Sequence, residues 1–348
     1  MPAPATPSVP TTQNAPHTSA PGPNGAAADA PPGRSCPLHY RYPPEVFQTE
    51  APADLQGLEV LYVVGGLYGN PLALDRVLAL FARERGRKRL VFNGDFHWFD
   101  ADPAVFAQVQ ATVLAHTALR GNVETELASD QDEGCGCAYP DWVGDAVVQH
   151  SNRIQQRLRL AATPALRAAL GALPMWLRAD VGPARIGIVH GDATSLAGWG
   201  FAQEHLRDPA HRDTVARWLD RAGVQAFASS HTCLPVFQGL PGAAGGAGPG
   251  RWVFNNGAAG MPNFRGDPAG LLTRIALHPH QGPERRFGVR AGGGALHVDA
   301  LAIDVDPTAW WQHFCTQWPT GSDAQRSYGQ RMQAGPDYSP GDALRPAG

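Results

Sequence analysis

Apolar runs and glycine-containing turns alternate along the chain from about Leu58 onward. The apolar run Glu59–Val64 leads into a glycine-rich turn, Gly65–Asn70, and Pro71 follows it directly. Proline is favoured at the first position of a helix, and apolar residues then recur at three- and four-residue spacing. These residues are Leu74, Val77, Leu78 and Phe81. The pattern predicts a buried strand, a turn and an amphipathic helix.

The same alternation continues through the next sixty residues. The apolar run Lys88–Asn93 ends beside Asp95, Asp102–Pro103 opens a helical stretch that reaches about His116, and Thr117–Arg120 leads into Gly121–Asn122. Strands that alternate with helices predict an α/β fold with parallel strands. Ligands of such folds bind in the loops at the carboxyl ends of the strands.

The second half of the chain adds helices and then becomes rich in strands. We expect helices over Asp145–Leu173, broken at Pro164, and over Phe201–Ala222, interrupted at Pro209. Short buried strands precede His190 and His231. Further strands are predicted at Val236–Gly239, Trp252–Asn255, Leu271–Leu277 and His297–Ile303.

Composition divides the chain into three regions. Residues 1–34 are rich in proline and alanine, with almost no large apolar residue, and therefore predict a disordered tail. Residues 35–318 form the predicted domain, with an irregular acidic insertion at 125–142 that carries Cys135 and Cys137. Residues 319–348 are polar and proline-containing, which predicts a second loose tail.

Charge and cysteine content exclude several classes of protein. The chain has 348 residues, 43% of them hydrophobic, and a net charge of −3 with its 28 basic residues scattered. Scattered basic residues do not predict a surface for nucleic acid. We expect no membrane partner, because no stretch approaches the roughly 20 consecutive apolar residues of a membrane span. Five irregularly spaced cysteines and no export signal predict free thiols and a cytoplasmic location.

Four strand ends carry side chains that bind metals. They are Asp95, Asn122, His190 and His231, and each follows a short apolar run. Mixed His, Asp and Asn ligation suits Mn, Fe or Zn. A metal held this way lowers the pKa of a bound water to about 7 and polarises a phosphoryl oxygen. We therefore expect a metal site in which Asp95 and His190 also serve catalysis.

The order and spacing of these motifs resemble the calcineurin-like metallophosphoesterases, particularly their small bacterial phosphodiesterase-like branch. The blocks that carry the resemblance are Gly66–Asn70, Gly94–Asp95, Gly121–Glu124, His190–Gly191, Ser230–Cys233 and Asn255–Pro262. The resemblance covers roughly Leu58 to Asp304. It implies a four-layer α/β/β/α sandwich, two mixed sheets flanked by helices, with a site for one or two divalent transition metals. It also implies hydrolysis of a small-molecule phosphate monoester, diester or nucleotide by metal-activated water.

The chain departs from the family pattern in one half of that site. The resemblance assigns one metal to Asp95, Asn122, His190 and His231, and all four residues are present. At the other metal's usual ligand positions, beside the shared Asp95, this chain has Gly66, Tyr68 and Cys233. Val123 replaces the histidine that assists the leaving group in the family.

Two accounts of the altered half compete. In one, Cys233, His97, Cys135 and Cys137 supply replacement ligands, and thiolates would favour zinc or iron. In the other, one metal or none is bound and the space serves the substrate. Candidate substrate contacts are then Tyr68, Arg120 and the backbone N–H groups near Gly66.

Three more side chains are candidates near the site. Trp98 and Trp199, with Tyr68, could form an aromatic wall for a nucleobase, and Asp192 could orient His190. Three functions follow: a phosphate-ester hydrolase, an inactive relative that binds a metal or nucleotide as a sensor, and a different metal-assisted reaction with cysteine ligands.

Overall fold

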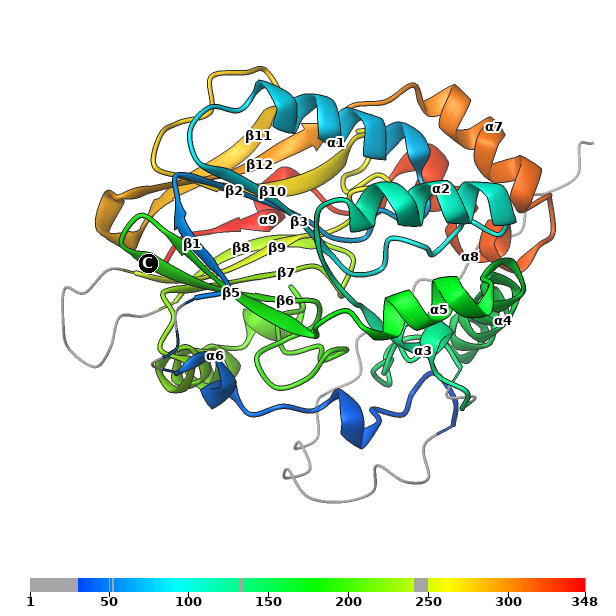
Figure 1. The fold of residues 1–348 in the computed structure, drawn as a ribbon, viewed down its shortest axis with the longest axis horizontal. Coiled ribbons are helices and arrows are strands. Elements are labelled where there is room, and N and C mark those ends of the chain that lie inside the picture. The colour runs from blue at the N-terminus through cyan, green and yellow to red at the C-terminus, as the bar shows by residue number, and fades with distance from the viewer. Residues whose placement is uncertain (1–30, 50, 52, 132–133, 241–249, 348) are drawn as a thin grey trace, which may run out of the picture.

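Two mixed β-sheets packed face to face form the centre of the protein, with helices on their outer faces (Figure 1). The computed structural model describes residues 31–49, 51, 53–131, 134–240 and 250–347. One sheet has six strands in the order β11-β12-β10-β2-β3-β4, and the other has seven in the order β1-β5-β6-β7-β9-β8-β13. The predicted four-layer sandwich is confirmed.

The six-stranded sheet contains the first strands predicted from the sequence. Its parallel strands are β2 (Val60–Val64), β3 (Lys88–Asn93) and β4 (Thr117–Leu119), and its antiparallel strands are β10 (Gly270–Ala276), β12 (Leu296–Ile303) and β11 (Arg285–Ala291). Alternate residues point to opposite faces of a strand. Leu61, Val63 and Val91 accordingly join the core between the sheets, whereas Tyr62 and Phe92 pack with the helices α1 (Pro71–Arg83) and α2 (Pro103–Leu114).

The seven-stranded sheet supplies the other half of the core. Its strands are β1 (Leu55–Leu58), β5 (Trp176–Val181), β6 (Ala184–Val189), β7 (Ala226–Ser229), β8 (Pro235–Leu240), β9 (Arg251–Asn256) and β13 (Leu344–Arg345). Helix α6 (Pro209–Ala222) begins at Pro209, and its apolar face packs with Phe227 and with Phe47 of the short 3-10 helix Pro44–Phe47.

Parallel pairing brings the predicted loops together. Strands β2, β3 and β4 are mutually parallel, as are β6, β7 and β9. The loops that follow them therefore meet at one edge of the sandwich. Three further helices, α3 (Asn122–Ala128), α4 (Asp145–Ala161) and α5 (Pro164–Gly171), pack beside this edge, and α5 begins at the predicted break (Figure 1).

The structure of the C-terminal region differs from the prediction made from the sequence. Residues 319–348 were expected to form a loose tail, but α8 (Asp323–Ala334) packs on α4, and β13 pairs with β8. The short helices α7 (Pro307–Gln317) and α9 (Pro340–Ala343) flank α8. Buried apolar residues such as Met332 hold this region to the core, a contact that local polarity does not reveal. The predicted N-terminal tail lies mostly outside the described residues.

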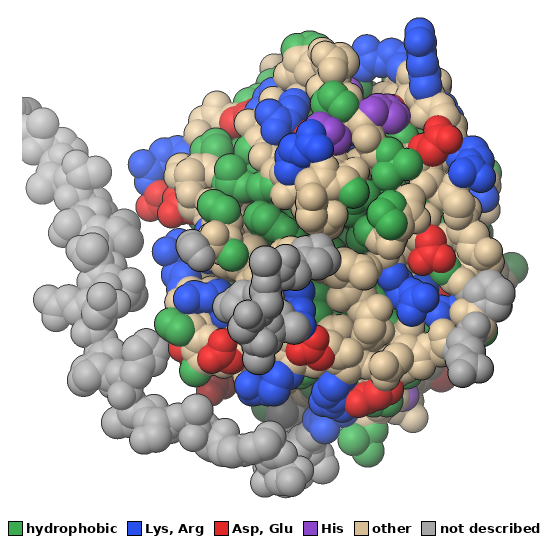
Figure 2. Space-filling view, turned by 90° about the vertical axis from the view of Figure 1, so that its left-hand side faces the viewer, with side chains coloured by type: hydrophobic (Ala, Val, Ile, Leu, Met, Phe, Trp, Pro, Cys, Tyr) green, Lys and Arg blue, Asp and Glu red, His purple; other side chains and the backbone are tan. Residues whose placement is uncertain are grey.

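Three expectations drawn from composition can be compared with the structure. Over the described residues, no helix has the length and apolar character needed to cross a membrane. Cys135 and Cys137 form a disulfide, so the prediction that these two thiols are free is wrong. On the face at the left of Figure 1, basic and acidic side chains are interspersed (Figure 2).

Candidate metal centre

A tight turn after β3 holds Asp95. Asp95 has a left-handed backbone conformation, with φ of 52°. The buried carboxylate of Glu124 accepts hydrogen bonds from the backbone N–H groups of Asp95 (2.8 Å), Phe96 (3.0 Å) and Gly121 (2.8 Å). Glu124 thereby fastens the β3 loop to the start of α3, a role that no sequence motif indicated.

Glycine is required on both sides of this junction. A Cβ atom on Gly94 would lie 2.6 Å from Nδ1 of His190, and one on Gly121 would lie 2.3 Å from Oδ1 of Asp95. Real Cβ atoms do not approach other atoms so closely, so any side chain here would push the loops apart. The glycines beside the predicted ligands thus have a physical reason: they let three loops converge.

The four ligands predicted for one metal do converge. Nε2 of His190 lies 3.3 Å from Oδ2 of Asp95, 3.2 Å from Oδ1 of Asn122 and 3.2 Å from Nδ1 of His231. All four side chains are buried. Among the described residues, Asp95, His190 and His231 form the one group of three His, Cys, Asp or Glu side chains placed closely enough to hold a metal ion.

Hydrogen bonds to backbone carbonyl groups fix the orientation of three ligands. Nδ1 of His190 lies 2.9 Å from the carbonyl oxygen of Asn93, and Nε2 of His231 lies 3.0 Å from that of Cys137. Nδ2 of Asn122 donates to the carbonyl oxygen of Cys135 at 2.8 Å. A histidine that donates through one ring nitrogen presents the lone pair of the other. His231 Nδ1 and Asn122 Oδ1 therefore present lone pairs to the centre of the cluster, and His190 Nε2 does so once it has lost its proton. This donor set fits a divalent transition metal.

The charges of the cluster are strongly coupled. Burial alone would raise the pKa of Asp95, but His190 beside it holds that pKa below its usual value. Burial alone would lower the pKa of His190, but Asp95 raises it. Burial and the neighbouring His190 lower the pKa of His231 to about 3. These shifts favour a charged Asp95 beside a protonated His190, with a neutral His231 next to them.

Aromatic and sulfur groups occupy the other half of the site. Oη of Tyr68 lies 3.0 Å from Sγ of Cys233, at the positions where the resemblance placed the second metal's ligands. Burial raises the pKa of both groups, which disfavours the thiolate of Cys233. The backbone N–H of Gly66 donates to the carbonyl oxygen of Gly94. The predicted phosphate contact through that N–H is therefore wrong.

His97 and the two disulfide cysteines do not rebuild the second metal site. Nδ1 of His97 lies 2.7 Å from Oδ2 of Asp100, and its ring stacks on Phe106 with centroids 3.7 Å apart. His97 is thus packed in the helix-covered core, away from the three convergent ligands. Cys135 and Cys137 are joined to each other by their disulfide and offer no thiolate.

Two predicted polar contacts also lie elsewhere. The guanidinium of Arg120 donates to the carbonyl oxygen of Gly171 at 3.0 Å, so it points toward the end of α5 rather than toward a phosphate. Asp192 accepts hydrogen bonds from the N–H groups of Thr194, Ser195 and Gly200 and therefore shapes its own loop. The group that orients His190 is the carbonyl of Asn93 instead.

A small pocket with aromatic walls opens beside the ligands. Asp95, Asn122 and His231 line it. Val123 and the cysteines Cys137 and Cys233 line it as well. Its aromatic walls are Tyr68, Trp98, Tyr139, Trp199 and Tyr328. The sequence pointed to three of them, but Tyr139 lies in the insertion and Tyr328 in the segment expected to be a tail. The space inside it that is open to the centre of a water molecule is about 30 Å³, which is enough to hold water.

Comparison with known proteins shows the fold. No protein-family model matches the sequence, and no curated protein matches it. A hypothetical protein from Pyrococcus horikoshii OT3 is similar in structure with a TM-score of 0.53 and 13% sequence identity, over 80% of this chain and 99% of the other. A metallophosphoesterase from Sphaerobacter thermophilus has a TM-score of 0.48 and 15% identity, over 80% of this chain and 100% of the other. The chain therefore shares its fold, two mixed sheets flanked by helices, with the Pyrococcus protein.

Proposed function

We propose that this protein hydrolyses phosphate esters with one divalent transition metal held by Asp95, Asn122, His190 and His231. The observation that carries the proposal is the convergence of four buried side chains whose oxygen and nitrogen atoms face one another. They lie at the carboxyl ends of strands, where α/β folds place their ligands. A bound divalent metal polarises a phosphoryl oxygen and lowers the pKa of water.

The charges of the pocket favour a phosphodiester over a monoester. No lysine or arginine is among the described residues that line it, and Asp95 is its one carboxylate. A divalent ion beside one carboxylate leaves a net charge of about +1, which balances the single negative charge of a diester. A monoester carries about −1.5 to −2 at neutral pH and would lack a cationic partner here.

The aromatic side chains of the walls narrow the pocket beside the ligands. The space open to the centre of a water molecule is about 30 Å³, which is enough for an ion or a water molecule. Among the side chains of the walls, Trp199 adjoins the exposed Trp142, with ring centroids 6.2 Å apart, so that aromatic surface continues from the ligands to the outside.

The competing function is metal binding without turnover. Val123 favours it, because valine cannot assist a leaving group at the position where the family has histidine. It predicts stoichiometric metal uptake and no hydrolysis under any metal.

The test measures metal content and hydrolysis together. Purified protein is loaded with Mn, Fe(II) or Zn and assayed with bis(p-nitrophenyl) phosphate and with p-nitrophenyl phosphate. We expect one metal per chain and faster hydrolysis of the diester. Asp95→Asn should abolish the activity, whereas Cys315→Ser on α7, outside the described pocket, should not change it. Metal uptake without hydrolysis of either ester would refute the proposed enzyme activity and support the binding function.

A further inference from the structure

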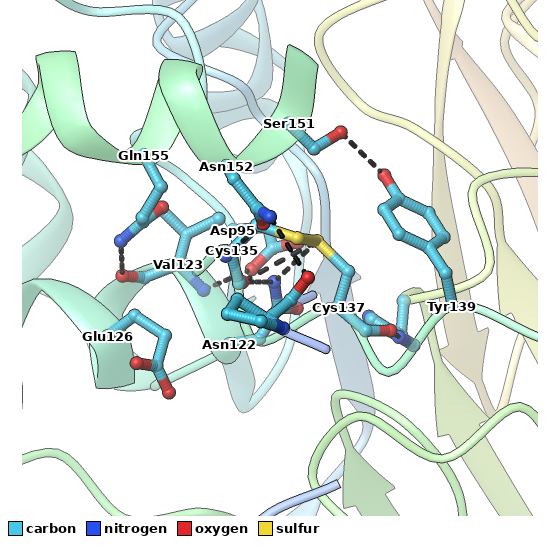
Figure 3. Close-up of a disulfide and its surroundings, with 12 residues drawn as sticks. Asp95, Asn122, Val123, Glu126, Cys135, Cys137, Tyr139, Ser151, Asn152 and Gln155 are labelled. Carbon is cyan, nitrogen blue, oxygen red and sulfur yellow. Dashed lines mark hydrogen bonds between the residues drawn. A yellow bond between two sulfur atoms is a disulfide. The ribbon is translucent and has the colours of Figure 1, made fainter. Parts of the chain in front are cut away.

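The short loop Cys135–Gly136–Cys137 touches two of the four ligands through its backbone. The carbonyl oxygen of Cys135 accepts from Nδ2 of Asn122 at 2.8 Å, and that of Cys137 accepts from Nε2 of His231 at 3.0 Å. Figure 3 shows the disulfide lying against Asn122 and Asp95. One covalently closed loop of three residues therefore contacts ligands that come from two different sheets.

Each contact decides which ligand atom faces the ion. The amide group of Asn122 can rotate by half a turn, and its bond to Cys135 holds Nδ2 away from the centre and Oδ1 toward His190. The bond from His231 to Cys137 holds the proton of His231 on Nε2, which leaves the lone pair on Nδ1. Partners of this kind set the tautomer and direction of a ligand.

The loop is itself fixed from several sides. Asn152 of α4 accepts from the N–H of Cys135 at 2.9 Å, and Nε1 of Trp199 donates to the carbonyl oxygen of Cys137 at 3.0 Å. Gly136 has φ of 60°, and a Cβ atom there would lie 2.3 Å from Oη of Tyr40. The disulfide then ties the two carbonyl-bearing residues together.

We propose that the Cys135–Gly136–Cys137 loop, closed by its disulfide, is the positioning element of the metal centre, because its two cysteine carbonyl groups orient Asn122 and His231 toward the ion. The inference rests on the proposed metal site but not on turnover. Removal of partners that orient metal ligands weakens metal binding by about 10- to 100-fold. Opening the disulfide should therefore weaken metal binding by a similar factor while the four ligands remain present.

The main test compares metal affinity in three proteins. The oxidised wild type, C135S/C137S and the matched control C315S are titrated with Mn²⁺ by calorimetry and with Co²⁺ by visible absorption. We expect one site in all three, an about 10- to 100-fold larger Kd in C135S/C137S only, and a changed Co²⁺ d–d spectrum in that variant. Circular dichroism and thermal melting establish that the variants are folded.

A second measurement covers the case in which the double variant does not fold. Folded wild type is treated with a water-soluble phosphine, which cleaves the S–S bond, gives two thiols and becomes the phosphine oxide with oxygen from water. After the phosphine is removed without air, Kd should rise by the same factor. G136A, which keeps both cysteines but displaces the loop, should raise Kd in the same direction.

Three results would overturn the inference. The first is a Kd within twofold of wild type in both the double variant and the reduced protein. The second is tighter binding after reduction with sulfur-to-cobalt charge transfer, which would make the thiols ligands. The third is a wild type that binds no metal, which would refute the proposed function as well. If wild type binds metal and the variants bind it with the same Kd, only the positioning role of the loop is refuted.

Discussion

The two halves of the site have the same framework and opposite chemistry. In one half, Asp95, Asn122, His190 and His231 present polar atoms to a common point, and backbone carbonyl groups hold three of them in place. In the other half, a tyrosine ring and a cysteine contact each other where the resemblance places metal ligands.

The two halves differ in what holds them in place. In the polar half, Glu124 and the glycines at 94 and 121 hold the loop of Asp95. In the other half, the buried side chain of Tyr68 contacts Cys233 through its hydroxyl. We therefore expect a metal to bind in the polar half and not in the other.

Loss of a ligand in the polar half should have the largest effect. His190→Ala removes the ligand that lies within 3.3 Å of the ligand atoms of Asp95, Asn122 and His231. We expect metal affinity to fall by about 100-fold or more, since even indirect partners of a metal are worth about 10- to 100-fold. Calorimetric titration with Mn²⁺ measures it, with Cys315→Ser as the control. An unchanged Kd would place the metal elsewhere.

The second-largest effect should come from weakening the hydrogen bonds by which Glu124 joins the Asp95 loop to α3. It should appear in the free energy of unfolding. Glu124→Gln replaces one acceptor oxygen by an NH₂ group that faces a backbone N–H, so a buried donor loses its partner. We expect the free energy of unfolding to fall by about 1–3 kcal/mol. Urea denaturation tests this against the exposed Glu45→Gln. Equal stability of the two variants would show that the junction does not hold the Asp95 loop.

Metal binding should depend on pH through His190. Burial alone would lower the pKa of His190, but Asp95 raises it. His190 therefore keeps its proton to a higher pH than an ordinary histidine does, and that proton competes with the metal. His231, with its pKa of about 3, is already neutral at these pH values. Affinity should therefore decrease about tenfold per unit as pH falls below the pKa of His190, with one proton released per metal. Calorimetry in buffers of different ionisation enthalpy counts that proton, and release of none would contradict the ion pair.

Changes in the packed half should have the smallest effect on binding. Tyr68→Phe removes the hydroxyl that contacts Cys233 but keeps the ring. We expect one metal per chain and a Kd within about twofold of wild type, because none of the four ligands is altered. Elemental analysis and titration measure both. If wild type instead bound two metals and Tyr68→Phe bound one, Tyr68 would be a metal ligand and both halves would bind metal.

The sequence by itself determined the framework and the polar half. Apolar runs set the strands, and a glycine or a short turn after each run places the next side chain at a strand end. Because parallel strands share one edge, Asp95, Asn122, His190 and His231 had to meet there. This part was predictable since each ligand is positioned by its own strand.

Only the tertiary structure decided the remaining contacts. His97 has the spacing of a ligand, but it stacks on Phe106 and bonds to Asp100. Tyr328 reaches the pocket from a helix that local polarity predicted to be a tail, and Cys135 pairs with Cys137 instead of binding metal. Side-chain direction in irregular loops depends on which distant residues bury them, and no local pattern records that partner. The altered half of the site consists of such contacts, so only packing could show that Tyr68 and Cys233 face each other there.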